Sequence, residues 1–274
     1  MSGNARDAPL GVFDSGLGGL TVVRALREML PNERIIYLGD TARVPYGTKG
    51  ATTVIKYALA CARHLVARDV KALVVACNTV SAVAPETLRV ELDLPVLGVV
   101  EPGARAAVAA SRTGRIGVLA TAGTIASGAY LRAVAQVSTR AEVVGQAAPL
   151  LVPLAEEGWN EGEVPRLVVR HYIEPLALAA VDVVVLGCTH YPLLRGLIEE
   201  EIHARIGPHV VVIDSARAVA ADVGDFLDSR SLASTRPSSG EAVKLLVTDV
   251  SRTFQEVATR FLGDAVGEVE QIDL

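Results

Sequence analysis

Two kinds of segment alternate along the chain: short apolar runs, and longer stretches with an apolar residue at every third or fourth position. The first kind is typical of strands buried on both faces of a parallel sheet, and the second of amphipathic helices. The alternation predicts an α/β fold with mainly parallel sheets flanked by helices. The predicted strands are 10–14, 34–38, 70–76, 96–100, 115–120, 141–144, 183–187, 210–213, 243–247 and 269–272.

The segments between these runs predict helices, turns and one loop. In the first such segment, Leu20, Val23, Leu26 and Leu30 share one helical face. Glu101-Pro-Gly103 predicts a turn and a boundary between two halves of the chain. Further helices are predicted at 52–67, from 78, from 121 to about 134, at 162–179, after residue 192 and at 252–262, with a mixed segment at 150–158 and an exposed, serine-rich loop at 228–240.

Two of the predicted strands end at a cysteine. The run 183–187 leads into Cys188-Thr-His190, and the run 70–76 leads into Cys77-Asn-Thr79. In open α/β sheets, ligands lie beyond the carboxyl ends of the strands. We therefore expect two half-sites that face one ligand. Asp14-Ser15 and Asp214-Ser215 also follow strands, which indicates two similar halves.

Composition narrows the classes of function. The formal net charge is −5 and no basic tract is present, which argues against a nucleic-acid partner. The uncharged stretch 72–85 falls short of the roughly 18 apolar residues of a membrane-spanning helix. Residues 1–9 lack the apolar core of a signal peptide. We expect a cytoplasmic protein without membrane association, whose three cysteines are thiols.

The two strand-end cysteines are candidates for chemistry. A free cysteine is commonly a small buried hydrophobe, and we interpret Cys61, inside a predicted helix, in that way. Cys77 and Cys188 instead precede small polar residues and predicted helices, and a helix N-terminus favours the thiolate. Asp14 and His190 could hold or return a proton near these thiols.

Other polar residues at the strand ends have two possible roles. Ser15, Asn78, Thr79, Thr121 and Thr189 could cap helices, or form a neutral rim that binds carboxylates and an ammonium group. The glycine-rich turn 14–19 is a weak phosphate-loop signal because it lacks the Gly-Lys-Ser/Thr ending. Asp40, Arg43 and Tyr46 are further candidates, and Tyr46 could equally pack as an aromatic lid.

Two opposed thiols suit the inversion of a stereocentre. One thiolate removes a proton from carbon, and the other thiol returns a proton to the opposite face, with no cofactor. A single Cys–His pair would indicate acyl transfer, but the second cysteine would then be unexplained. A zinc site built from Cys77, Cys188 and His190 is a further alternative that lacks an obvious fourth ligand.

Six motifs together resemble glutamate racemase, of the aspartate/glutamate racemase superfamily. They are Gly11-Val-Phe-Asp-Ser-Gly-Leu-Gly-Gly-Leu20, Tyr37-Leu-Gly-Asp40, Pro45-Tyr-Gly47, Ala76-Cys-Asn-Thr79, Pro102-Gly-Ala-Arg105 and Gly187-Cys-Thr-His-Tyr-Pro192. The match runs in order from about residue 10 to residue 213, and the last six residues are also similar to the family.

The resemblance implies roles for individual residues. Cys77 takes the proton from D-glutamate and Cys188 takes it from L-glutamate, assisted by Asp14 and His190. The implied substrate contacts are Asp14, Ser15, Tyr46, Gly47, Asn78, Thr79, Thr121, Thr189 and His190, with Glu156 as a weaker candidate. No metal or other cofactor is implied.

The resemblance also implies the architecture and the biological setting. Two similar α/β domains enclose the site, the first from residues 1–98 and 211–274 and the second, inserted, from residues 99–210. The implied enzyme is a cytoplasmic homodimer that supplies D-glutamate for peptidoglycan. Aspartate racemase and a non-enzymatic module that binds an anionic metabolite or a protein partner are the alternatives.

Overall fold

The strands of the computed structural model, which describes residues 5–235 and 242–274, form two parallel sheets. The first sheet has the order β10-β9-β2-β1-β3-β4 and the second the order β6-β5-β7-β8, and every pairing is parallel. The strands are β1 (Leu10–Asp14), β2 (Ile35–Gly39), β3 (Ala72–Val75), β4 (Val96–Gly98), β5 (Arg115–Ala120), β6 (Glu142–Ala147), β7 (Val183–Gly187), β8 (Val211–Asp214), β9 (Val243–Val247) and β10 (Val269–Gln271). The predicted α/β class is confirmed.

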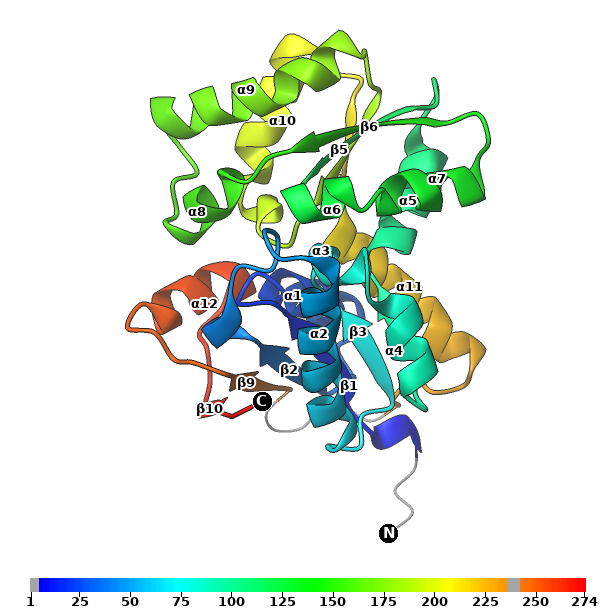
Figure 1. Cartoon of the computed structure of the whole chain (residues 1–274), viewed down its shortest axis with the longest axis vertical. Coiled ribbons are helices and arrows are strands. Elements are labelled where there is room, and N and C mark those ends of the chain that lie inside the picture. The colour runs from blue at the N-terminus through cyan, green and yellow to red at the C-terminus, as the bar shows by residue number, and fades with distance from the viewer. Residues whose placement is uncertain (1–4, 236–241) are drawn as a thin grey trace.

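Figure 1 shows two lobes stacked along the long axis of the molecule, one around each sheet. The first lobe contains the first sheet with α1 (Leu20–Met29), α2 (Ala51–Val66), α3 (Asn78–Ser81), α4 (Pro85–Glu91), α11 (Ser215–Ser229) and α12 (Phe254–Leu262). The second lobe contains the second sheet with α5 (Val100–Ala110), α6 (Ala122–Ala126), α7 (Ala129–Val137), α8 (Leu151–Glu156), α9 (Glu163–Leu178) and α10 (Arg195–Arg205). Short 3-10 turns lie at Ala5–Asp7, Thr41–Arg43 and Tyr191–Leu194.

Burial on both faces explains why the strands contain uninterrupted apolar runs. Every residue of β1 and β7 is buried. Successive residues of β1 enter different cores, since Val12 belongs to one apolar cluster and Phe13 to another. The same holds for Val184 and Val185 of β7. Both central strands are therefore held by side chains on two sides, which fixes the positions of the residues that follow them.

The chain crosses between the lobes twice. After β4, α5 enters the second lobe, where Val100 and Ala104 join its apolar core. The predicted return to the first domain at residue 211 is wrong for β8, because this strand pairs with β7 in the second sheet. The return begins instead with α11, whose Ala216 and Val219 join the core of the first lobe. A strand's partner depends on packing, which the local pattern does not record.

Several local predictions also need correction. The predicted turn at 101–103 lies inside α5, where Pro102 is tolerated because the first turn of a helix needs no N–H from it. The helix predicted from 121 to 134 is two helices, separated at Gly128, which has a left-handed φ of 66°. The mixed segment 150–158 contains α8. The predicted loop at 228–240 starts later, since α11 ends at Ser229, and residues 236–240 lie outside the described part of the chain. Among the described residues, no helix is both long and apolar enough to cross a membrane.

Candidate active site

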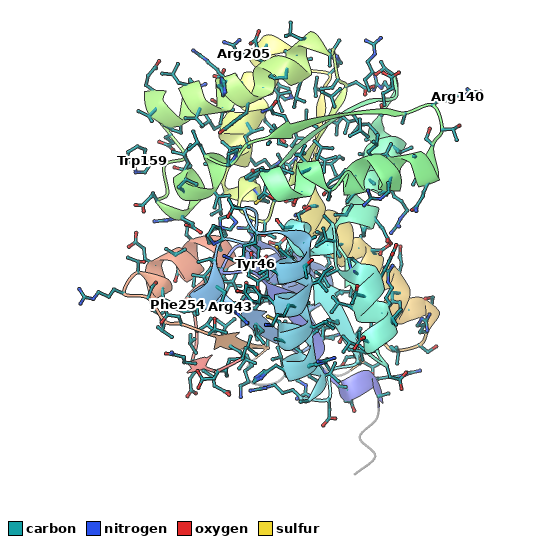
Figure 2. The ribbon with its side chains drawn as sticks, in the orientation of Figure 1. Arg43, Tyr46, Arg140, Trp159, Arg205 and Phe254 are labelled. Atoms are coloured by element: carbon teal, nitrogen blue, oxygen red, sulfur yellow. The ribbon has the colours of Figure 1, made fainter. Side chains whose placement is uncertain are left out.

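A cavity of about 460 Å³ lies between the carboxyl ends of the two sheets. Ser15 follows β1, Cys77 follows β3, Thr121 follows β5 and Cys188 follows β7, and all four line this cavity. Figure 2 shows Tyr46, another lining residue, near the junction of the two lobes. The structure thus brings together Ser15, Tyr46, Gly47, Cys77, Asn78, Thr79, Thr121, Cys188, Thr189, His190 and the weaker candidate Glu156. Asp14, Asp40 and Arg43 do not line the cavity.

Cys77 has a buried environment that favours the neutral thiol. It is the N-cap residue of α3, and only 5% of it is exposed. Its Sγ lies 3.5 Å from Ser15 Oγ. Burial, and next the negative charge of Asp14, raise the pKa of Cys77 to about 12, although the Ser15 contact acts in the opposite direction. At neutral pH Cys77 is therefore a proton donor.

Cys188 has a different partner, an imidazole. Its Sγ lies 3.9 Å from His190 Nδ1, and His190 Nε2 lies 3.0 Å from Glu156 Oε1. Burial lowers the pKa of His190, but Cys188 and Glu156 outweigh burial and raise this pKa to about 10. In return, the hydrogen bond from His190 lowers the pKa of Glu156. His190 thus lies between the sulfur of Cys188 and the carboxylate of Glu156, where its ring can hold a proton and return it.

Asp14 lies behind the cavity wall and is not one of the lining residues. Its Oδ2 accepts hydrogen bonds from the backbone N–H groups of Gly16 and Gly19, at 3.2 and 3.0 Å. Its Oδ1 is buried and has no hydrogen-bond partner among the described residues. Burial raises the pKa of Asp14, while the charge of His190 lowers it. Asp14 therefore shapes the turn that carries Ser15, and its charge acts on the thiol of Cys77.

The polar rim of the cavity joins the lobes. Thr79 Oγ1 of the first lobe lies 2.9 Å from Thr121 Oγ1 of the second. The backbone N–H of Gly123 donates to the carbonyl of Gly47 at 3.0 Å, again between lobes. Thr21 Oγ1 of α1 donates to the carbonyl of Thr189 at 3.0 Å. These bonds hold hydroxyl groups from both lobes at one surface, where they suit the carboxylates of a small ligand.

Tyr46 is held by residues outside the cavity. Its hydroxyl donates to the buried carboxylate of Asp40, which also pairs with Arg43 Nε at 2.7 Å. The Arg43 guanidinium lies 4.4 Å from the ring centre of Tyr57. Because the Tyr46 hydroxyl is already bonded, its ring forms an aromatic wall of the cavity. Asp40 and Arg43 are thus supports for Tyr46.

The mouth of the cavity includes a helix that the sequence motifs did not indicate. Phe254, Val257 and Arg260 of α12 line the cavity, and the Arg260 guanidinium donates to the backbone carbonyl of Glu156. The ring of Phe261 meets the His190 ring edge-on, with centroids 5.0 Å apart. The only sequence signal here was the amphipathic helical pattern of 252–262, which carries no chemical motif.

Two further points of the sequence analysis concern Cys61 and the zinc alternative. Cys61 is fully buried in an apolar cluster of the first lobe, which agrees with its structural interpretation. Within residues 5–235 and 242–274, no group of three His, Cys, Asp or Glu side chains is arranged to hold a metal ion. The geometry that the zinc alternative requires is therefore not present in the described residues.

Comparison with known proteins identifies the family. The family model described as Asp/Glu/Hydantoin racemase matches residues 18–223. The chain belongs to this racemase family. It is 50% identical to the glutamate racemase of Geobacter metallireducens, over 97% of the chain and 96% of that protein. It is 45% identical to the glutamate racemase of Neisseria meningitidis serogroup C, over the full length of both. The predicted resemblance to glutamate racemase is confirmed.

Solved structures agree with this assignment. The glutamate racemase of Francisella tularensis in complex with D-glutamate superimposes with a TM-score of 0.90 at 34% identity, over 98% of each chain. The aspartate racemase of Picrophilus torridus superimposes with a TM-score of 0.54 at 17% identity, over 82% of this chain and 94% of that one. The second comparison shows a shared fold alone. The chain is thus 34% identical to this protein named for glutamate and 17% identical to this protein named for aspartate.

Proposed function

We propose that this racemase interconverts L- and D-glutamate with Cys77 and Cys188 as two bases on opposite faces of Cα. The observation that carries the proposal is the presence of two strand-end thiols, one from each lobe, on a single cavity. Full-length relatives named glutamate racemase at 45–50% identity support glutamate as the substrate. No cofactor takes part in the proposed reaction.

In the direction from L- to D-glutamate, the Cys188 thiolate removes the Cα proton, so that a C–H bond breaks and an S–H bond forms. The electron pair left on Cα is delocalised into the adjacent carboxylate. The Cys77 thiol then gives its proton to the opposite face, so that its S–H bond breaks and the new C–H bond forms. The product complex holds Cys188 as thiol and Cys77 as thiolate. The reverse reaction starts from this swapped state.

The environments of the two thiols support this direction of proton flow. Cys188 has His190 beside it as a group that can exchange protons with it, while burial raises the pKa of Cys77 and keeps it protonated. His190 can also deliver a proton to the sulfur of Cys188, from which it is 3.9 Å away. The hydroxyls of Ser15, Thr79 and Thr121 are suited to donate to substrate carboxylates, and Tyr46 forms a wall beside them.

We further propose the setting that the family resemblance implies. The enzyme would be a cytoplasmic homodimer whose D-glutamate is used for peptidoglycan. Sedimentation of the purified chain tests the dimer, and dependence of a cell-wall-forming host on added D-glutamate after deletion of the gene tests the role. The enzyme should act on glutamate in preference to aspartate.

The proposed chemistry is tested by mutation of each thiol in deuterated water. The wild type should convert L-glutamate to D-glutamate with deuterium at Cα, in the presence of a chelator. Cys77→Ala and Cys188→Ala should each abolish racemisation, which we take as a loss of about 10⁴-fold or more because no base remains on one face. The matched control is Cys61→Ala, which should keep wild-type turnover. Normal racemisation by both single active-site variants would exclude the two-thiol mechanism.

A further inference from the structure

One buried side chain contacts the chain neighbours of both thiols. Tyr130 of α7 is 3% exposed, and its hydroxyl donates to Asn78 Oδ1 at 2.8 Å. Its ring packs against Gly187, where an added Cβ would lie 3.1 Å from Tyr130 Cε2. Asn78 directly follows Cys77, and Gly187 directly precedes Cys188. Tyr130 itself does not line the cavity.

The hydrogen bonds around Asn78 form a chain with a defined direction. Ser215 Oγ lies 2.9 Å from the carbonyl of Leu186, an atom that only accepts, so the Ser215 proton points there. The oxygen of Ser215 is then an acceptor for Asn78 Nδ2, at 3.5 Å. Asn78 Oδ1 consequently faces Tyr130, which donates to it. Tyr130, Asn78 and Ser215 are all at least 97% buried, so water does not compete with this chain.

The chain of bonds lies where the polypeptide crosses between the lobes. Ser215 begins α11, the returning segment, and Leu186 belongs to β7, the strand that delivers Cys188. Gly103 of α5, the outgoing segment, packs beside the same two residues: an added Cβ would be in ordinary van der Waals contact, 3.4 Å from Tyr130 Oη and 3.7 Å from Ser215 Cβ. Asn78 and Gly187, the residues next to the two cysteines, are therefore linked by contacts at α5 and α11, the two segments that cross between the lobes.

We propose that Tyr130 is a positioning residue which, together with Ser215, holds the Cys77 and Cys188 half-sites at one separation across the substrate Cα. The inference rests on the proposed two-thiol racemisation. Two-base inversion needs both sulfurs aligned with one carbon, and a misplacement of about 1 Å can cost roughly 100-fold in rate. Tyr130 acts on this alignment through Asn78 and Gly187, without contact with the substrate.

The test measures where the abstracted proton is replaced. L-glutamate is incubated with enzyme in deuterated water, and two products are followed: D-glutamate, and L-glutamate that has gained deuterium at Cα. Tyr130→Phe removes the hydroxyl and keeps the ring. We expect kcat for racemisation to fall about tenfold in both directions, because the second thiol is less well aligned. The ratio of exchange with retention to inversion should rise, because the carbanion persists longer and is more often reprotonated on its original face by a Cys188 thiol that has exchanged its proton for solvent deuterium.

Two further variants separate positioning from folding. Tyr172→Phe is the matched control, since this buried phenol accepts from the backbone N–H of Leu150 within the second lobe. It should leave the exchange ratio unchanged. Ser215→Ala removes the acceptor at the other end of the hydrogen-bond chain. It should raise the ratio of exchange with retention to inversion, as Tyr130→Phe does. Thermal unfolding of each variant checks that the fold is kept.

Two outcomes overturn the inference. One is a wild-type exchange ratio in both Tyr130→Phe and Ser215→Ala. The other is an equal rise of the ratio in Tyr172→Phe, which would make the effect a general response to a weakened second lobe. Both leave the proposed function intact as long as the Cys77→Ala and Cys188→Ala variants remain inactive.

Discussion

The surroundings of Cys77 and Cys188 differ although both thiols end a parallel strand and line one cavity. Cys77 has a neutral hydroxyl at 3.5 Å and a buried carboxylate behind it, and its pKa rises to about 12. Cys188 has an imidazole at 3.9 Å, which a carboxylate at the far nitrogen keeps charged. Two copies of one functional group thus have different partners, a hydroxyl at Cys77 and an imidazole at Cys188. A two-base reaction starts from one thiolate and one thiol, and its reverse starts from the opposite arrangement.

Among the variants that test this difference between the thiols, the largest loss of rate is expected when Cys188 loses its charged partner. His190→Asn keeps a polar side chain but removes the acid–base group that lies 3.9 Å from Cys188 Sγ. We expect kcat/KM for L-glutamate to fall about 100-fold, within the usual range for a positioned acid or base. Polarimetry from each enantiomer measures the effect. An undiminished rate would show that Cys188 does not depend on His190.

A smaller effect is expected from Glu156→Gln. Wild-type His190 has its pKa raised to about 10, so its charge, and the stability that the charge confers, is full below about pH 6.5 and is lost as the pH rises through about 10. Loss of the Glu156 carboxylate lowers this pKa, so the alkaline fall in kcat/KM for L-glutamate should move to lower pH. We expect about a tenfold loss of rate at pH 9 and less at pH 7.

The pH dependence has a direct spectroscopic check. Titration of the His190 ring by NMR should show a lower pKa in Glu156→Gln than in the wild type. Glu157→Gln is the matched control, because Glu157 also lines the cavity and adjoins Glu156 in the chain. An alkaline limb that stays in place in Glu156→Gln would mean that the carboxylate does not hold the charge of His190.

The smallest effect is expected on the side of Cys77. Ser15→Ala removes the hydroxyl 3.5 Å from Cys77 Sγ, a contact that lowers the pKa of this thiol. We expect about a threefold lower kcat/KM for D-glutamate, since one long neutral hydrogen bond contributes little. Progress curves from both enantiomers measure this rate against that of the wild type. A tenfold or larger loss would give Ser15 a greater part in proton transfer than its geometry indicates.

The local pattern of the sequence determined the elements and the reactive groups. A strand that is buried on both faces needs an apolar run, so β1, β3 and β7 could be predicted without knowledge of the strands that pair with them. The polar residues that follow these strands could also be predicted as site residues, because ligands of parallel sheets bind beyond the carboxyl ends of the strands. That is why Cys77, Cys188 and His190 could be named from the chain alone, and why Cys61, inside a helix, could be set apart.

Only the tertiary structure decided which distant residues meet. Glu156 and His190 are 34 positions apart, and their hydrogen bond exists because α8 packs against the 3-10 turn Tyr191–Leu194 that follows His190. The contact of Arg260 with Glu156 spans 104 positions and joins the two lobes. The placement of Asp14 behind the wall, and of β8 in the second sheet, likewise depends on packing. Local patterns are set by the burial of each segment, whereas the pairing of segments is set by the combined packing of both lobes, which no single stretch of sequence encodes.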